Sequence, residues 1–380
     1  MRVLVVNAGS SSLKHALVDT RSDAILVRGE ERWEPGGEPG RHARALRAAL
    51  GAAGASGADA VGHRVVHGGA RFDGPVGIDA EVRAAIAALA PLAPLHTRAA
   101  LEGIDAAAAA LPRLAQVASF DTAFHRTLAP EAATYALPHE WSERFGLRRY
   151  GFHGLNVAWC HGQALAALGP ERCQRLVVCH LGSGCSVSAV RDGRSVDTTM
   201  GFTPLEGMPM ATRSGSIDPG LLLHLLACGV APDELDEALN QRSGLLGIAG
   251  IAGLREVERA ALDGDRRAQL AFDVLVRGAA GAIAAMSTSL CGLDALVFTA
   301  GAGEHSALLR ASICARLAHL GVELDPARNA SHADRISAAR AGVDVLVVAA
   351  GEEIVIARET AGVAGAAAVG RAAARSSRSA

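Results

Sequence analysis

The sequence predicts an α/β protein built from two duplicated domains, and three observations lead to this prediction. The chain has 380 residues, which is more than one hydrophobic core usually supports. Short β-branched runs alternate with helix-like stretches, as in folds whose largely parallel sheet is covered by helices. Two distant segments, Val3–Asp19 and Leu176–Asp192, share a pattern of strand, Gly- and Ser-rich turn, and second strand. This repeat indicates one unit that occurs twice and opens each time with a hairpin.

The predicted strands are short continuous apolar runs, as expected for strands buried on both faces. In chain order they are Val3–Val6, Ala60–Val66, Leu176–Cys179, Ala295–Thr299 and Val343–Ala349. The helix-like stretches lie between these runs. They are Arg41–Ala53, Ala80–Ala90, Arg98–Ala110, Val157–Leu168, Pro219–Leu226, Arg266–Ser289 and Ala307–Leu320. The tail after Gly370 is small and polar, and we expect it to be disordered.

Composition excludes several classes of protein. The alanine-rich stretches are broken before they reach membrane-spanning length, and the first apolar run is too short for a signal-peptide core. We therefore expect a cytoplasmic location and no membrane partner. The net charge of −2 removes the case for nucleic acid binding by bulk electrostatics, so the partner should be a small molecule. The seven scattered cysteines form no CxxC pair or zinc spacing, which predicts free and mostly buried thiols.

Three Gly-rich turns follow predicted strands and suit contacts with phosphate. Such a turn needs Gly for close backbone access, hydroxyls or amides as donors, and a nearby cation. Asn7–Lys14 (NAGSSSLK) supplies all of these, although it lacks the GxxxxGK[ST] pattern of a P-loop. His180–Gly184 (HLGSG) and Ala300–Ser306 (AGAGEHS) are the other two turns. Together they favour a kinase or ATPase, because a nucleotide triphosphate in a cleft between duplicated domains needs contacts from both.

Four side chains are candidates for handling a phosphoryl group and its acceptor, a task that depends mainly on positioning and cation clamping. Arg64 (VGHRVVHGG) and Asp121 (SFDTAFH) lie at the ends of apolar strands. His153 lies in YGFHG, and Arg213 lies in the loop MATRSGSIDPG. A position after a strand in an α/β fold favours a functional role over that of a solvated surface residue.

Taken in order, these motifs resemble those of the acetate kinase family, within the superfamily of sugar kinases, Hsp70 and actin. VLVVNAGSSSLK is similar to the family's opening signature, and VDTTMGFTPLEGMPMATRSGSIDPG is similar to its second. Further similar segments are HRVVHGG, APLH, FDTAFH, YGFHG, HLGSG, SGLLGIAG, FTAGAGE and EEIVIARET. The resemblance covers roughly residues 1–362.

The resemblance implies two duplicated ribonuclease H-like (actin-like ATPase) domains with an active-site cleft between them. Residues 1–123 would form the first domain together with a returning helix in 354–380. Residues 124–353 would form the second, nucleotide-binding domain. A homodimer is implied by the resemblance alone.

The resemblance also implies a role for each matching residue. Asp121, His153 and Arg213 would be catalytic, and Arg64 would bind the acyl carboxylate. The apolar acyl pocket maps onto Val66, Leu95, Phe152 and Pro204. The nucleotide-binding set is Ser10, Ser12, Lys14, His180, Gly182, Ser183, Gly184, Arg255, Gly301, Gly303 and Glu304. ATP would be the co-substrate, and Mg²⁺, for which Mn²⁺ could substitute, would be held through oxygen ligands by Asn7 and Glu352.

Departures from the family pattern lie on the nucleotide side. Ser183 and His305 stand where asparagine is usual, Ser216 replaces an acid, and Gly253 replaces the usual acidic residue before Leu254. These changes put the affinity for the phosphoryl donor and the choice of nucleotide in doubt. The four charged candidates are unchanged.

The implied activity is reversible, ATP-dependent phosphorylation of acetate to acetyl phosphate by direct in-line transfer. A fatty carboxylate has a pKa near that of Glu, about 4.3, and needs no base at neutral pH. Asp121 is therefore expected to orient an arginine or a Mg²⁺-bound water. Arg64 and Arg213 would offset the repulsion between the anionic nucleophile and the γ-phosphate.

Three alternatives stay open. A propionate or butyrate kinase keeps the chemistry, and Val66 favours acetate because a smaller residue there would admit longer chains. A nucleotide-binding homologue with weak or no turnover is compatible with the substitutions on the nucleotide side. A sugar kinase would need several polar acceptors, whereas the mapped pocket is apolar with one cation.

Overall fold

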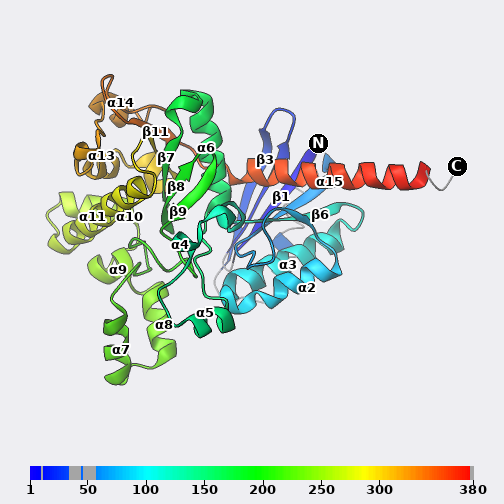
Figure 1. Cartoon of the computed structure of the whole chain (residues 1–380), viewed down its shortest axis with the longest axis horizontal. Helices are drawn as coiled ribbons and strands as arrows, with labels where there is room; N and C mark the ends of the chain where they lie inside the picture. The colour runs from blue at the N-terminus through cyan, green and yellow to red at the C-terminus, as the bar shows by residue number, and fades with distance from the viewer. Residues whose placement is uncertain (10–11, 34–43, 46–56, 377–380) are drawn as a thin grey trace. The chain divides into compact units, whose positions relative to one another are not determined.

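The computed structural model describes residues 1–9, 12–33, 44–45 and 57–376. These residues divide into two compact units, each with one β-sheet and helices packed on it (Figure 1). Unit 1 comprises Met1–Arg126, Gly154–Trp159 and Gly351–Ala380. Unit 2 comprises Thr127–His153 and Cys160–Ala350. The helix expected at Arg41–Ala53 falls almost wholly outside the described residues.

The sheet of unit 1 has the strand order β3-β2-β1-β4-β6-β5. Strand β1 pairs antiparallel with β2 and parallel with β4, and β4 pairs parallel with β6. The strands are β1 (Arg2–Ala8), β2 (Ser12–Asp19), β3 (Ala24–Arg32), β4 (Ala60–Val65), β5 (Val76–Gly77) and β6 (Ala115–Phe120).

The sheet of unit 2 repeats this arrangement, with the order β9-β8-β7-β10-β11 matching β3-β2-β1-β4-β6. Strand β7 pairs antiparallel with β8 and parallel with β10, and β10 pairs parallel with β11. The strands are β7 (Arg175–Leu181), β8 (Cys185–Arg191), β9 (Arg194–Thr198), β10 (Ala295–Thr299) and β11 (Asp344–Val348). The predicted duplication and fold class are confirmed. The expectation of a largely parallel sheet was wrong, because each opening hairpin contributes antiparallel strands and makes its sheet mixed.

Two helices cover the two faces of the unit 1 sheet. Alternate residues of β1 enter two separate clusters, as the two-residue period of a strand requires. Val3 and Val5 pack with Ile356 of α15 (Glu352–Ser376), which runs along the sheet in Figure 1. Leu4 and Val6 pack with Ala107 of α3 (Pro94–Ala110). The remaining helical segments of this unit are α2 (Ala80–Ala88), η2 (Ala90–Leu92) and η3 (Ala123–Thr127), which reaches the unit boundary.

Unit 2 is built around α11 (Arg266–Ser289), which packs on β7, β8 and β9. The side chain of Asp265 caps its first turn by accepting hydrogen bonds from Arg267 N and Ala268 N. Among the described residues, α11 is the one helix long and apolar enough to cross a membrane, and its packing on the sheet indicates a core helix instead. The other helical segments are α4 (Pro130–Ala133), α5 (His139–Phe145), η4 (Pro170–Arg172), α7 (Pro219–Ala227), α8 (Pro232–Gln241), α9 (Gly244–Ala249), α10 (Leu254–Leu262), α12 (Ala300–His305), α13 (Ala307–Ala315), η5 (Ala318–Leu320) and α14 (Pro326–Ala330), with α6 (Gly154–Leu168) shared between the units.

Parallel pairing places the predicted functional segments at common sheet edges. In unit 1, Asn7 is near the carboxyl end of β1, Arg64 is near that of β4, and Asp121 directly follows β6. In unit 2, His180 of β7 lies opposite Thr299 of β10, so the two Gly-rich turns that follow these strands start side by side. Ligands of α/β sheets bind at this kind of edge.

The buried His63 of β4 provides a test of the unit 1 core. Its Nε2 lies 2.7 Å from Gln116 Oε1, and burial lowers its pKa to about 4. In the unfolded chain His63 has the ordinary histidine pKa of about 6.5 and binds a proton more readily than in the folded protein. The free energy of unfolding therefore falls as the pH drops below about 6.5. Between pH 7 and 5 we expect wild type to lose about 2 kcal/mol more unfolding free energy than His63→Gln in urea titrations. The exposed His139→Gln is the control, and equal pH slopes for wild type and His63→Gln would contradict the assignment.

Candidate active site

A buried ion pair between Arg64 and Asp121 forms the centre of the unit 1 cluster. Arg64 Nε donates to Asp121 Oδ1 at 3.0 Å, and Nη2 donates to Oδ2 at 2.5 Å. Asp121 N also donates to Val65 O at 3.0 Å, which extends the β4–β6 pairing beyond the strand end. The side chain of Asp121 is 1% exposed and that of Arg64 is 18% exposed. Two parallel bonds fix the plane of the guanidinium as well as its position.

Two further predicted residues lie against the same guanidinium. Asn7 Oδ1 is 3.5 Å from Arg64 Nη1, and Glu352 Oε2 is 3.4 Å from Arg64 Nε. Glu352 is the first residue of α15, so segments from both ends of the chain meet here. The structure thus brings Asn7, Arg64, Asp121 and Glu352 together within unit 1.

The charges of this cluster do not cancel. Burial raises the pKa of Asp121 to about 6, the positive charge of Arg64 opposes that shift, and Glu352 adds to it. Burial also disfavours the charged form of Arg64, but Asp121 and Glu352 together raise the pKa of Arg64 above its usual value. Both partners are therefore ionised at neutral pH. One guanidinium faces two carboxylates, and the surplus negative charge favours an added cation.

Two stacked imidazoles mark the corresponding region of unit 2. The rings of His153 and His180 are 3.9 Å apart and nearly parallel, with an interplanar angle of 11°. His153 Nδ1 lies 3.0 Å from Ser186 Oγ, a buried hydroxyl of β8. His153 adopts a left-handed backbone conformation (φ 60°) directly before α6, while His180 is fixed in β7.

Arg213 lies beside these rings and has no carboxylate partner among the described ion pairs. A Cβ added at Gly184 would lie 3.3 Å from Arg213 Nη1 and 3.5 Å from His153 Cε1, so all three residues are neighbours. Arg213 Nη1 donates to Pro204 O at 3.3 Å. Burial lowers the pKa of Arg213 but does not neutralise it. An uncompensated guanidinium in this position is suited to an anionic ligand.

The two Gly-rich turns of unit 2 lie next to each other. Gly182 N donates to Gly184 O at 3.1 Å, and a Cβ at Gly182 would lie 3.7 Å from Ala300 Cβ at the start of α12. Glu304 Oε1 of α12 accepts from Ala350 N at 3.0 Å. Ser183 O is 3.4 Å from Ala211 N, which ties the first turn to the loop that carries Arg213.

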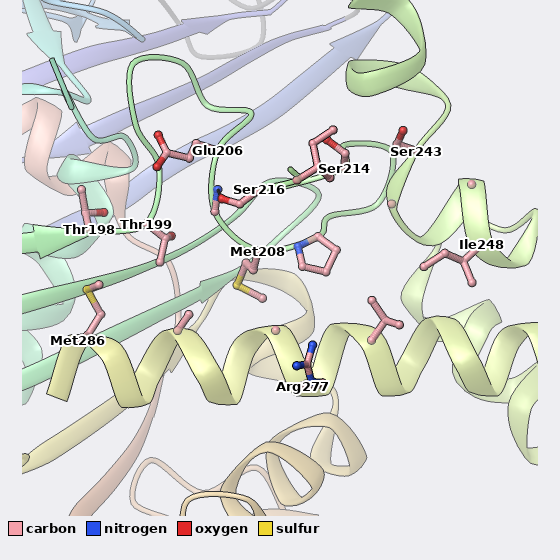
Figure 2. Close-up of a pocket in the computed structure, with 18 of the residues that line it drawn as sticks. Thr198, Thr199, Glu206, Met208, Ser214, Ser216, Ser243, Ile248, Arg277 and Met286 are labelled. Atoms are coloured by element: carbon pink, nitrogen blue, oxygen red, sulfur yellow. Dashed lines mark hydrogen bonds between the residues drawn. The ribbon is translucent and has the colours of Figure 1, made fainter. Parts of the chain in front are cut away.

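That loop is anchored to α9 and borders a pocket. Leu245 N donates to Met210 O at 2.9 Å, and Ser243 N donates to Thr212 O at 2.9 Å. A pocket of about 910 Å³ lies beside the loop, with Met208 above α11 in Figure 2. Its lining includes Ser214 and Ser216 but none of His153, His180 and Arg213. The pocket is therefore separate from the histidine and arginine cluster.

The remaining predicted residues are spread more widely. Ser10 and the side chain of Leu95 lie outside the described part of the chain. Lys14 is exposed on β2, where it pairs in register with Asn7, and Ser12 starts the same strand. The acyl-pocket residues are divided between the units: half-buried Val66 is in unit 1, whereas buried Phe152 and half-buried Pro204 are in unit 2. Exposed positions are occupied by Arg255 on α10 and Gly301 on α12, while Gly303 is buried.

Sequence reasoning missed several supporting residues. Ser186, which orients His153, lies two positions after the HLGSG turn in an ordinary alternating strand pattern. Glu206 accepts hydrogen bonds from Tyr135 Oη and, at 2.7 Å, from Arg149 Nη2. This network fixes the segment before Arg213. Glu206 falls inside a motif used for the resemblance, but its partners are remote in sequence and give no local signal.

Comparisons with known proteins agree on one family. A family model described as the acetokinase family matches residues 45–358. The acetate kinase of Leifsonia xyli subsp. xyli is 47% identical over 386 residues, covering 94% of this chain and 97% of that protein. The acetate kinase of Synechococcus sp. is 45% identical over 394 residues, covering 94% and 98%. The structure is similar to a propionate kinase from Francisella tularensis (TM-score 0.90, 37% identity, covering 95% of this chain and 99% of that one). It is also similar to Porphyromonas gingivalis acetate kinase (TM-score 0.88, 35% identity, covering 95% and 99%).

Alanine substitutions at two glycines of α6 test how closely this helix packs against the backbone of Asp121. Gly154 N donates to Asp121 O at 2.9 Å, and a Cβ at Gly154 would lie only 2.2 Å from that oxygen. We expect Gly154→Ala to displace the Asp121 backbone and to cost about 1–3 kcal/mol in urea unfolding. Gly162→Ala is the matched control, because it meets open space in the same helix and should be neutral or stabilise by up to about 1 kcal/mol. Similar losses in the two variants would refute the close approach.

Proposed function

The chain belongs to the acetokinase family, and from this premise we propose that it is an acetate kinase, which transfers the γ-phosphoryl group of ATP reversibly to acetate. Its relatives named acetate kinase match nearly the whole chain. The structural observation that carries the proposal is an arginine in each unit: Arg64, which Asp121 holds by two hydrogen bonds, and Arg213, which has no carboxylate partner among the described residues. Such cations suit the two anions that must approach each other in this reaction.

Arg64 is assigned to the acyl carboxylate. A guanidinium has five N–H donors. Asp121 accepts hydrogen bonds from Nε and Nη2 of Arg64, so further N–H donors remain on Nη1 and Nη2. Acetate is already ionised at neutral pH, so the reaction needs no general base. The ion pair supports a positioning role for Asp121: it fixes Arg64, which in turn orients the nucleophilic oxygen.

Residues of unit 2 are assigned to the phosphoryl group. The acetate oxygen attacks the γ-phosphorus as the bond to the bridging oxygen of ADP breaks, and charge develops on the phosphoryl oxygens and on ADP. Arg213, His153 and His180 would stabilise this charge as preorganised groups. The turns His180–Gly184 and Ala300–Glu304 would contact the nucleotide, with Ser12, Lys14 and Arg255 as further contacts.

Asn7 and Glu352 fit a magnesium region. Their oxygens reach the same guanidinium, and the cluster carries surplus negative charge. Mg²⁺ is commonly held by one or two protein oxygen ligands together with waters and substrate phosphates, which agrees with this sparse donor set. When bound, the ion would neutralise charge on the phosphates of ATP.

The location and the assembly of the protein are further parts of this proposal. We place the protein in the cytoplasm, and its seven cysteines, all free thiols, support a reducing compartment. We propose a homodimer, supported by the exposed Leu221, Leu223 and Leu226 of the short helix α7, which offer apolar side chains to a partner. Light scattering should give twice the 38.8 kDa chain mass, and a monomer at micromolar concentration would overturn the dimer.

The first test is a hydroxamate assay for acyl phosphate with Mg·ATP and acetate, propionate or butyrate. We expect acetate to give the highest kcat/KM, because one extra methylene beside Val66 should cost about 1–3 kcal/mol. Preference for propionate would support the alternative suggested by the Francisella propionate kinase. No product from any acid, or with other phosphoryl donors, would indicate a nucleotide-binding protein without turnover.

Replacing Asp121 tests its positioning role. Asp121→Asn should lower kcat about 100-fold because Arg64 loses its orientation. The unfolding free energy should fall as well, because Arg64 keeps its charge and loses its two-bond partner. Asp105→Asn breaks an exposed two-bond pair with Arg83 and should leave kcat unchanged. Full recovery of Asp121→Asn activity at high pH would contradict a positioning role, because the substrate is already deprotonated.

A further inference from the structure

Arg310 is a fully buried cation that the proposed reaction does not use. It lies in α13, is 0% exposed, and is among the largest completely buried side chains of the described residues. None of the ion pairs in the described part of the chain includes it. Arginine is almost never buried without a partner, so this position needs an explanation.

Every N–H group of this guanidinium has an acceptor. Nε donates to Asn329 Oδ1 at 2.9 Å, and Nη1 donates to Gly303 O and to Glu304 O, both at 2.8 Å. Nη2 donates to Asn329 O at 2.9 Å and lies 3.0 Å from His332 Nδ1. All five donors are used when His332 carries its proton on Nε2, and none of the five acceptors is a carboxylate. The hydrogen-bonding groups of the Arg310 guanidinium are thus satisfied, but no carboxylate among the described residues balances its positive charge.

Two of these acceptors are the free carbonyl groups at the end of α12. A helix leaves its last carbonyls without intrahelical partners. In α12, Ser306 N donates to Ala302 O at 3.0 Å, and Arg310 takes the next two carbonyls, those of Gly303 and Glu304. The guanidinium therefore caps the carboxyl end of the Ala300–His305 turn from inside the protein, where water would otherwise be required.

The capped turn is also held on its other sides. A Cβ at Gly303 would lie 3.4 Å from Phe298 C and 3.7 Å from Leu181 Cβ, so the turn packs closely on β10 and β7. The side chain of Glu304 accepts from Ala350 N. On the far side of Arg310, Asn329 Nδ2 donates to Ala307 O at 2.9 Å, which joins α14 to the start of α13. Arg310 is the group that links the turn to this frame.

We propose that Arg310 is a positioning residue for the phosphoryl donor, which holds the Ala300–His305 turn in the one conformation that binds ATP. The inference rests on the proposed function, in which this turn contacts the nucleotide. An apolar side chain would fill the same core without burying a charge, but it would leave the carbonyls of Gly303 and Glu304 without a donor, so what the arginine adds is its set of hydrogen bonds to the turn. Lysine cannot replace it, because an ammonium has three donors and no planar fork.

The test compares Arg310→Lys with wild type in the full chain. We expect the KM for ATP to rise about tenfold, the effect of losing roughly 1.4 kcal/mol of hydrogen bonding, while the KM for acetate stays within about twofold. Arg175→Lys is the matched control, since Arg175 also makes several bonds in unit 2, to Asp294 and Cys291 at the other end of β7. It should leave both KM values unchanged.

A second variant and a binding measurement ensure that every outcome either supports or contradicts the inference. If Arg310→Lys does not fold, His332→Ala removes one acceptor and should show the same KM split at about two- to threefold. Unchanged KM values, or equal changes for ATP and acetate, would overturn the inference. Calorimetric titration with ATP distinguishes a failure of the inference about Arg310 from a failure of the proposed function. If wild type makes no acetyl phosphate, weaker ATP binding by Arg310→Lys still supports the inference, and equal binding or no binding by wild type overturns it.

Discussion

In-register parallel pairing of β1, β4 and β6 is the constraint on which the unit 1 cluster depends. Val65 lies opposite Phe120, and Asp121, the residue that follows β6, continues the pairing through its backbone N–H. A slip of one residue would turn every side chain to the other face of its strand. The side chain of Arg64 would then no longer face Asp121, and the polar side chains would lie in the apolar clusters. The core that fixes the register therefore also fixes the charges.

The two units carry different chemical groups at equivalent places of the duplicated fold. In unit 1, the carboxyl ends of the parallel strands carry the amide of Asn7, the guanidinium of Arg64 and the carboxylate of Asp121. These groups suit a carboxylate substrate and a metal ion. Unit 2 ends the equivalent strands with His180 and with glycine turns, which suit close approach to phosphate. In both units, the sheet is a rigid base and the candidate functional residues lie at or just beyond the carboxyl ends of its parallel strands. Supporting groups outside the strand ends, such as the buried Arg310 and the half-buried Glu206, hold those segments in place.

Sequence reasoning recovers what depends on local pattern. The apolar runs gave β1, β4, β7, β10 and β11, the periodic stretch Arg266–Ser289 matches α11, and the repeated hairpin predicted the duplication. Strands β3 and β9 were missed because half-exposed, charged strands lack a continuous apolar run. Arg64 and Asp121 stood out by following strands, but their pairing depends on strand order. Ser186 and Arg310 could not be found, since their partners are distant backbone and side-chain atoms.

The chain leaves unit 1 after Arg126, passes through it again at Gly154–Trp159 and returns at Gly351. On the ribosome, the strands of unit 1 are made first but wait for Ile356 and Ala357, which close the cluster around Val3 and Val5. Glu352 arrives with the same helix. A nascent or truncated chain that ends before α15 thus has neither a sealed core in unit 1 nor a complete set of acidic groups. Synthesis of the last helix is therefore the step that closes the unit 1 core, and we expect chains that end before it to be more exposed to proteolysis.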